Sequence, residues 1–174
     1  MTHFLKIAIA VVLASMAFFM VYNRFFNPNH ISTLETTSTK MPNFEFEGMD
    51  SKALSYKNLE QGKQSVISFF HPDCAHCQEL AANIFRKKKR LQNTNILMVS
   101  TAPIDKITKF AADFNLLNQP NILFATDTKG SFFAYFGDAF VPMLLVYDAE
   151  KQQKAVIKGD DISINEVLEA VETN

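Results

Sequence analysis

The sequence predicts an α/β fold, a mixed central β-sheet flanked by helices, and three features of the chain indicate it. Residues 65–70 and 95–100 are short, largely apolar runs that are typical of buried strands. Each run precedes a stretch with apolar residues at helical spacing, at 77–91 and at 104–114. Residues 143–158 then read as a hairpin ahead of a closing helix. Such units give a sheet that mixes parallel and antiparallel strands.

The other expected elements are shorter. They are a half-buried strand at 44–47 that meets Gly48 and enters a hairpin, a strand at 121–126, and an aromatic helix at 129–136. Pro103 suits the first turn of the helix at 104–114. Residues 163–166, Ser-Ile-Asn-Glu, form a capping-box pattern that opens the last helix. The rings of the aromatic helix are expected in the core: Phe132, Phe133, Tyr135 and Phe136.

Composition bounds the kind of protein. The 174 residues, 48% of them hydrophobic, suffice for one domain with a substantial core. A formal net charge of -1 gives no indication of a nucleic-acid partner. The chain has only two cysteines, so no framework of structural disulfides is expected.

The N-terminus predicts a membrane anchor over residues 1–26. Residues 7–23 are uncharged and mostly apolar, between Lys6 and Arg24, and a spanning helix needs about 17–25 residues. A cleaved signal peptide, cut at Ser15-Met16-Ala17, and a buried helix of the domain are the alternatives.

A polar segment follows the predicted anchor. Residues 27–40 are rich in Ser and Thr and lack apolar periodicity, so they are expected to form a flexible linker. As a coil, this segment would span about 20 Å on average. The globular domain is therefore predicted at 41–174.

The two cysteines form the motif Cys74-Ala75-His76-Cys77, between a predicted strand and a predicted helix. A dithiol at this spacing can close a small disulfide, and a helix N-terminus favours a thiolate. The alternatives without catalysis are a static structural disulfide or two thiols buried in the core. His76 either donates charge or a hydrogen bond to the thiolate or is simply solvated.

A metal site is the competing chemistry at this motif. His71, Asp73 and His76 flank the cysteines, but zinc commonly takes a second Cys/His pair, which the sequence lacks. We therefore predict neither a metal nor an organic cofactor, and soft-metal handling stays as an alternative.

Three segments give the domain a family resemblance: Met41-Pro42-x-Phe44, residues 64–70 leading into Cys74, and Phe140-Val141-Pro142 before a strand. On these residues the chain resembles thioredoxin-fold proteins, and more narrowly the membrane-anchored thiol–disulfide oxidoreductases of the TlpA/ResA type from bacterial envelopes. The resemblance implies a thioredoxin-like fold with a cis Val141-Pro142 bond beside the dithiol. It also implies that Cys74 is the low-pKa nucleophile and that Cys77 resolves the mixed disulfide.

The chain departs from the family at four positions. Asp73 replaces the usual Trp, and Ser68 replaces the buried acid of thioredoxins. His76 replaces a frequent Pro, and Leu80 replaces a common Glu, with Glu79 one residue earlier.

Two charged features have competing interpretations. Glu79 and Asp138 are the nearest candidate proton acceptors, although Glu79 also suits a first-turn helix charge and Asp138 a loop residue. The basic run at 86–90 suits the C-terminal end of the motif helix, and contact with anionic lipid head groups is its functional alternative.

Together, these observations predict a membrane-tethered, extracytoplasmic thiol–disulfide oxidoreductase that exchanges disulfides through Cys74 and Cys77. Its expected partners are protein thiol/disulfide clients, an unidentified redox partner and, through the N-terminal helix, the membrane. The expected location is the bacterial inner membrane, with the domain facing the periplasm or the outside. The alternative is a non-catalytic thioredoxin-like module that binds a partner or a soft metal. The direction of electron flow stays open.

Overall fold

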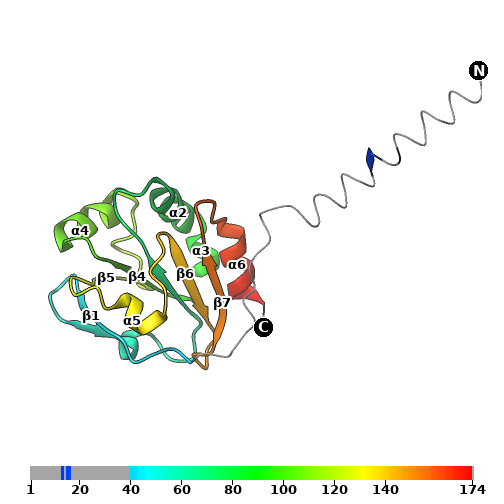
Figure 1. The fold of residues 1–174 in the computed structure, drawn as a ribbon. Coiled ribbons are helices and arrows are strands. Elements are labelled where there is room, and N and C mark those ends of the chain that lie inside the picture. Colours follow the sequence, from blue (N-terminus) through cyan, green and yellow to red (C-terminus); the bar gives the residue numbers. More distant parts are fainter. Residues whose placement is uncertain (1–12, 14, 17–39, 174) are drawn as a thin grey trace, which may run out of the picture. The chain divides into compact units, whose positions relative to one another are not determined.

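The computed structural model describes residues 13, 15, 16 and 40–173, and the elements below belong to the second of the two units of the chain, residues 33–174 (Figure 1). Apart from helical Leu13, Ser15 and Met16, the predicted anchor lies outside the described residues, as does the predicted linker up to Lys40. Within the described part, no helix combines the length and the apolar character that crossing a membrane requires.

The described strands form one mixed sheet in the order β2-β1-β5-β4-β3-β6-β7. Strands β3, β4 and β5 run parallel, and the other pairings are antiparallel. The strands are β1 Glu45–Gly48, β2 Ala53–Ser55, β3 Ser65–Phe69, β4 Asn95–Ser100, β5 Ile122–Thr126, β6 Met143–Tyr147 and β7 Gln153–Lys158. The helices are the 3-10 turn η1 Tyr56–Asn58 and the α-helices α2 Ala75–Arg86, α3 Lys88–Leu91, α4 Ile104–Asp113, α5 Phe132–Phe136 and α6 Ile164–Glu172.

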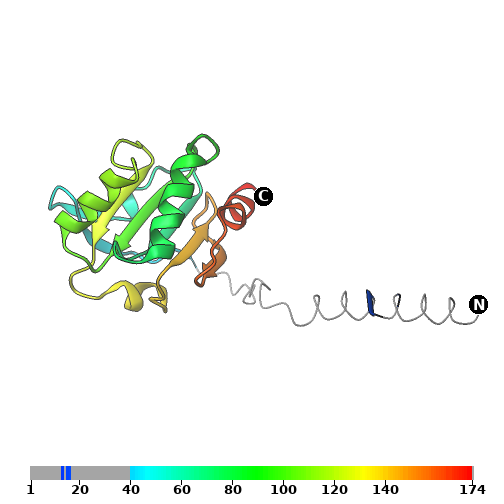
Figure 2. The ribbon, with the colours of Figure 1, turned by 90° about the horizontal axis from the view of Figure 1, so that it is seen from above.

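Both faces of the sheet are covered, and β3 is buried along its whole length. Val66 of β3 and Phe70, which follows the strand, belong to the core under α2, α4 and α6, while Ile67 and Phe69 belong to the core under α5 and the N-terminal hairpin. Figure 2 looks onto α2 and α4 as they lie across the first of these faces. This arrangement explains the continuous apolar run, because a strand between two helical layers needs apolar side chains on both faces. The predicted mixed α/β sheet is confirmed.

The helix expected over 77–91 starts two residues earlier than expected and is broken within the range, while its expected end at Leu91 is the end of a second helix, α3. Helix α2 begins at Ala75, ends at Arg86 and is separated from α3 by Lys87, whose φ and ψ of -100° and 11° leave the helical region. Five consecutive cations place like charges three and four residues apart, which disfavours a continued helix.

The aromatic helix is shorter than expected and only partly buried. It begins at Phe132, because the Asp127 carboxylate accepts hydrogen bonds from the backbone N–H groups of Ser131 and Phe132. Phe132 is buried and stacks on Phe69, with ring centroids 4.3 Å apart, and Tyr135 and Phe136 are half-buried. Phe133 is 62% exposed, so its expected core position is wrong. A helix this short presents one side to the core and the other to solvent.

The predicted cap of the last helix is confirmed, with a different bonding pattern. The Ser163 hydroxyl accepts a hydrogen bond from the Asn165 N–H. The reciprocal capping box is instead seen at η1, between Ser55 and Asn58.

Candidate active site

The two cysteines lie where β3 passes into α2. Cys74 is the N-cap residue of α2, and its Sγ accepts a hydrogen bond of 3.3 Å from the Cys77 backbone N–H. The Cys74 N–H itself donates to the His71 carbonyl over 3.1 Å. A sulfur in this position faces unpaired N–H groups at the positive end of the helix dipole, which stabilises negative charge on it.

The environments of the two sulfurs differ sharply. Both are free thiols in this structure, and Cys74 is half-buried whereas Cys77 is 1% exposed within the core under α2. Burial, reinforced by the neighbouring Cys74 sulfur, raises the pKa of the Cys77 thiol from 9.0 to about 12. At neutral pH Cys77 therefore holds its proton, and Cys74 is the sulfur that an incoming group can reach.

The Val141-Pro142 bond is cis, as predicted. Phe69, the last residue of β3, pairs with Met143, the first residue of β6. The segment that leads to Cys74 and the segment that contains Pro142 therefore leave the sheet at the same end. We call this end, marked by Phe69, Ser100 and Met143, the dithiol end. Pro142 is buried, while Val141 is partly exposed.

Asp73 is exposed and takes part in a small polar cluster. Its carboxylate lies 3.3 Å from Lys106 Nζ, and its N–H donates to His71 Nδ1 over 3.2 Å. Because Nδ1 accepts this bond, the His71 ring in this arrangement carries its proton on Nε2. Sequence reasoning missed Lys106. The expected parallel pairing of the two buried strands could have indicated it, because the helices that follow parallel neighbouring strands begin at the same end of the sheet, which brings Lys106 of α4 near the start of α2.

Of the two candidate proton acceptors, Asp138 is the expected loop residue and Glu79 is not where it was expected. Glu79 is exposed and lies in the second turn of α2, so the first-turn role is wrong. Asp138 is a loop residue at the dithiol end, where its carboxylate lies 2.6 Å from Lys158 Nζ. The hydrogen bond from Lys158 lowers the pKa of Asp138, which makes this carboxylate a weaker base. His76 is exposed, and within residues 40–173 neither its side chain nor that of Glu79 forms a hydrogen bond or an ion pair.

Ser68 lies on the face of β3 that the core with Cys77 covers. It pairs with Met98 on one side and Leu144 on the other, and both belong to that core. The hydroxyl is fully buried, and no hydrogen-bond partner for it is present in the described part of the chain. A neutral, unpaired hydroxyl thus stands where thioredoxins, by the resemblance, carry an acid.

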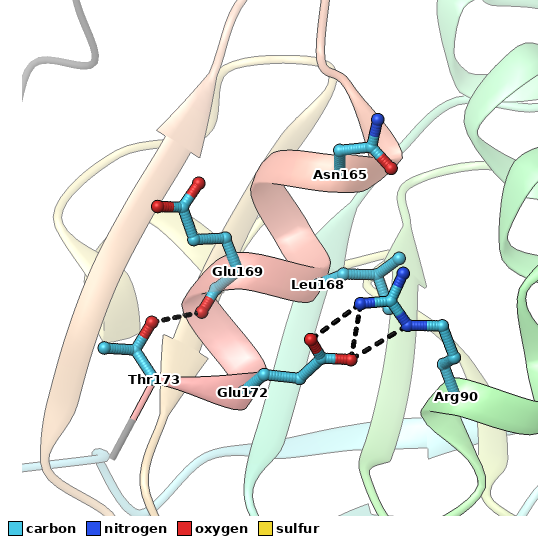
Figure 3. A pocket seen from close by; sticks show the side chains of 6 residues that line it. All are labelled: Arg90, Asn165, Leu168, Glu169, Glu172 and Thr173. Atoms are coloured by element: carbon cyan, nitrogen blue, oxygen red, sulfur yellow. Dashed lines mark hydrogen bonds and ion pairs between the residues drawn. The ribbon is translucent and has the colours of Figure 1, made fainter.

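Two other kinds of site were considered. Among the described residues, no three His, Cys, Asp or Glu side chains gather in a way that could hold a metal ion. A hollow of about 310 Å³ lies between α3 and α6 (Figure 3). The guanidinium of Arg90 and the carboxylate of Glu172 form an ion pair of 2.6 Å in this hollow. No cysteine lines the hollow. Because α2 is about 18 Å long and Arg90 follows its C-terminal end, this hollow is remote from Cys74.

Comparisons with known proteins agree with this fold. The sequence model of the redoxin family matches residues 36–169. No curated protein matches the chain.

Solved structures with low sequence identity share the fold. A secreted Mycobacterium tuberculosis disulfide oxidoreductase, homologous to Escherichia coli DsbE, matches with 20% identity and a TM-score of 0.64, over 74% of this chain and 94% of its own. Peroxidoxin BcpB from M. tuberculosis matches with 18% identity and a TM-score of 0.66, over 78% and 96%. A putative thioredoxin from Neisseria meningitidis matches with 19% identity and a TM-score of 0.64, over 77% and 89%.

Proposed function

The chain belongs to the redoxin family and is a thiol–disulfide oxidoreductase of thioredoxin-like fold, and on this premise we propose that Cys74 and Cys77 exchange disulfides with protein clients. The observation that carries the assignment of roles is the contrast between the two sulfurs. Cys74 is accessible at a helix N-terminus, and Cys77 is buried with a raised pKa.

The exchange has two steps. Cys74 Sγ, as a thiolate, attacks one sulfur of a client disulfide, the client S–S bond breaks, and the departing client sulfur takes up a proton. Cys77 then loses its proton and attacks Cys74 Sγ, which forms the Cys74–Cys77 disulfide and releases the second client sulfur. Two electrons have passed from the dithiol to the client, and the reverse sequence oxidises a client dithiol. A second thiol–disulfide protein returns Cys74 and Cys77 to their starting state.

The proton on Cys77 suits this order of events. Part of the rise in its pKa comes from the Cys74 sulfur beside it, through a hydrogen bond and through charge. Once Cys74 is bound in a mixed disulfide, its negative charge is gone, and burial is the main remaining obstacle to ionising Cys77. The resolving thiol therefore becomes easier to deprotonate at the step that needs it.

The client segment is expected to bind beside Val141. Pro142 has no N–H, and Val141 is partly exposed at the dithiol end. An extended client segment that pairs with the Val141 backbone would bring its own sulfur toward Cys74. Asp73 and Lys106 would contact the client from the other side.

The domain is further proposed to be tethered to the bacterial inner membrane, facing the periplasm or the outside. The support is the apolar run at 7–23 and the polar segment at 27–40. Mass spectrometry of the protein from membranes should find Met1 or Thr2 at the N-terminus, and protease added from outside should reach the domain. A mature chain that starts near Phe18 would replace the anchor by a cleaved signal peptide.

The exchange function is tested with matched cysteine variants. Cys77→Ser should accumulate mixed disulfides, with clients and with oxidised glutathione, because no resolving thiol remains. Cys74→Ser is the control and should accumulate none. Trapping through Cys77 in the control would reverse the roles. If Cys74 of the unaltered protein fails to react with oxidised glutathione at neutral pH, a non-catalytic binding module replaces the proposed function.

A further inference from the structure

The basic run, Arg86, Lys87, Lys88, Lys89 and Arg90, lies at the end of the sheet opposite the dithiol. Cys74 caps the N-terminus of α2 and Arg86 ends it, which separates them by about 18 Å along the helix. The segment after the run is tied to the starts of the parallel strands. The Asn121 side chain donates to the carbonyl oxygens of Leu91 and Thr94, over 2.8 Å each.

The chain enters the domain at this same end. The Met41 N–H donates to the Lys151 carbonyl over 2.8 Å, and Lys40 forms a β-bridge with Gln152. The Lys151 ammonium in turn donates to the Lys63 carbonyl over 3.1 Å. Gln64, the next residue, accepts a hydrogen bond from the first residue of β4. We call this end of the sheet the entry end.

The cations of the basic run are mostly unneutralised. Arg90 pairs with Glu172 over 2.6 Å, and it is the only member with a carboxylate partner among the described residues. Arg86 bonds the neutral Asn83 side chain, and Lys88 Nζ lies 4.0 Å from the centre of the Phe85 ring. Lys87 and Lys89 form neither an ion pair nor a side-chain hydrogen bond within residues 40–173.

Neither the helix dipole nor nearby acids account for this charge. The dipole of α2 acts only within its last turn, which contains Arg86. Lys88, Lys89 and Arg90 lie in the four-residue helix α3, a single turn in which they are as close to the positive end as to the negative end. Near the entry end, Glu60 is held by Lys63 over 2.6 Å, Asp148 interacts with the charge of Lys151, and Glu150 is exposed in the turn between β6 and β7. Positive charge therefore remains in excess beside the point where the chain enters.

We propose that the basic run docks on an anionic lipid bilayer and so holds the dithiol end away from the membrane. This inference rests on the proposed tether. A linker that spans about 20 Å keeps the entry end close to the bilayer, and attraction to anionic head groups acts within a Debye length, about 10 Å at 0.1 M salt. With the entry end on the lipid, Cys74 and Val141 face the aqueous side, where client proteins arrive.

Lysine footprinting of the full-length protein tests the docking. The protein is reconstituted into vesicles of phosphatidylcholine alone or of phosphatidylcholine with phosphatidylglycerol, and an external amine-acetylating reagent is added. Mass spectrometry then gives the acetylation rate of each lysine. On the anionic vesicles, Lys87, Lys88 and Lys89 should react several-fold more slowly than on the zwitterionic ones. High salt should abolish the difference.

The chain supplies its own controls. Lys129 is exposed and follows Thr126, the dithiol-end residue of β5, and exposed Lys158 pairs with Met143 at the same end, so their rates should be the same on both vesicles. The double variant Lys87→Gln/Lys89→Gln should lose the protection of Lys88, whereas Lys129→Gln/Lys158→Gln should keep it.

Each outcome separates the docking from the tether, which extraction of the same vesicles with alkaline carbonate reports. Equal lysine rates on both vesicles in a chain that resists extraction overturn the docking and leave the tether. Salt-sensitive protection in a chain that carbonate releases supports the docking and overturns the tether. Equal protection on both kinds of vesicle would show that something other than anionic lipid covers the run, and it overturns the docking.

Discussion

The raised pKa of Cys77 leads to a quantitative prediction for alkylation. Iodoacetamide reacts with thiolates, so the rate at a given pH follows the thiolate fraction. With its pKa moved from 9.0 to about 12, Cys77 at pH 7 should be ionised to about one part in 100,000, compared with about one part in 100 for an unburied thiol. Its alkylation should therefore be about a thousandfold slower than that of an ordinary thiol. The rate should also rise about tenfold per pH unit, with no plateau below about pH 12.

The assay alkylates the reduced protein between pH 6 and pH 10 and quantifies each cysteine by mass spectrometry. Cys74→Ser is the matched control, because it keeps the burial of Cys77 and removes the sulfur beside it. In this variant Cys77 should react faster than in the unaltered protein and still slower than a free thiol, since burial is the larger cause of its raised pKa. If Cys77 reaches a plateau near pH 9, or reacts faster than Cys74 at pH 6, the reasoning from burial is wrong.

Three further predictions follow from individual side chains. His76→Pro should make the Cys74/Cys77 couple more reducing by several tens of millivolts, at about 30 mV per 1.4 kcal/mol; an unchanged potential against glutathione would show that exposed His76 is merely solvated. Burial raises the pKa of Tyr147, so above the unfolded value of about 10 this hydroxyl ionises in the unfolded chain before it does in the folded one, and the free energy of unfolding should fall as pH rises. In urea unfolding, the free energy of unfolding of Tyr147→Phe should fall less above about pH 10 than that of the unaltered protein. The same pH dependence in both proteins would contradict this prediction. Ser68→Ala removes a buried, unpaired hydroxyl and should leave the free energy of unfolding unchanged or raise it by about 1 kcal/mol; a loss above about 2 kcal/mol would mean that the hydroxyl has a partner.

Much of the fold could be predicted because its signals are local. Strand β4 has the bounds that its apolar run predicts, and the hairpin of β6 and β7 surrounds the expected turn. The motif between a buried strand and a helix likewise places Cys74 at an N-cap, since capping depends on a few neighbouring residues. Periodicity of apolar residues and turn chemistry are properties of consecutive residues, so a single sequence contains them.

The tertiary structure decided what depends on register and on packing between distant segments. It brought Lys106 to Asp73, turned Phe133 outward and left Ser68 without a partner in the core. It also buried Cys77 far more deeply than Cys74, three residues away, because Cys77 lies on the buried face of α2 whereas Cys74 caps the start of the helix. The sequence by itself determined the elements and the dithiol. The different reactivities of the two sulfurs, and the basic run's place beside the entry of the chain, arise only when the sheet aligns segments that are far apart in sequence.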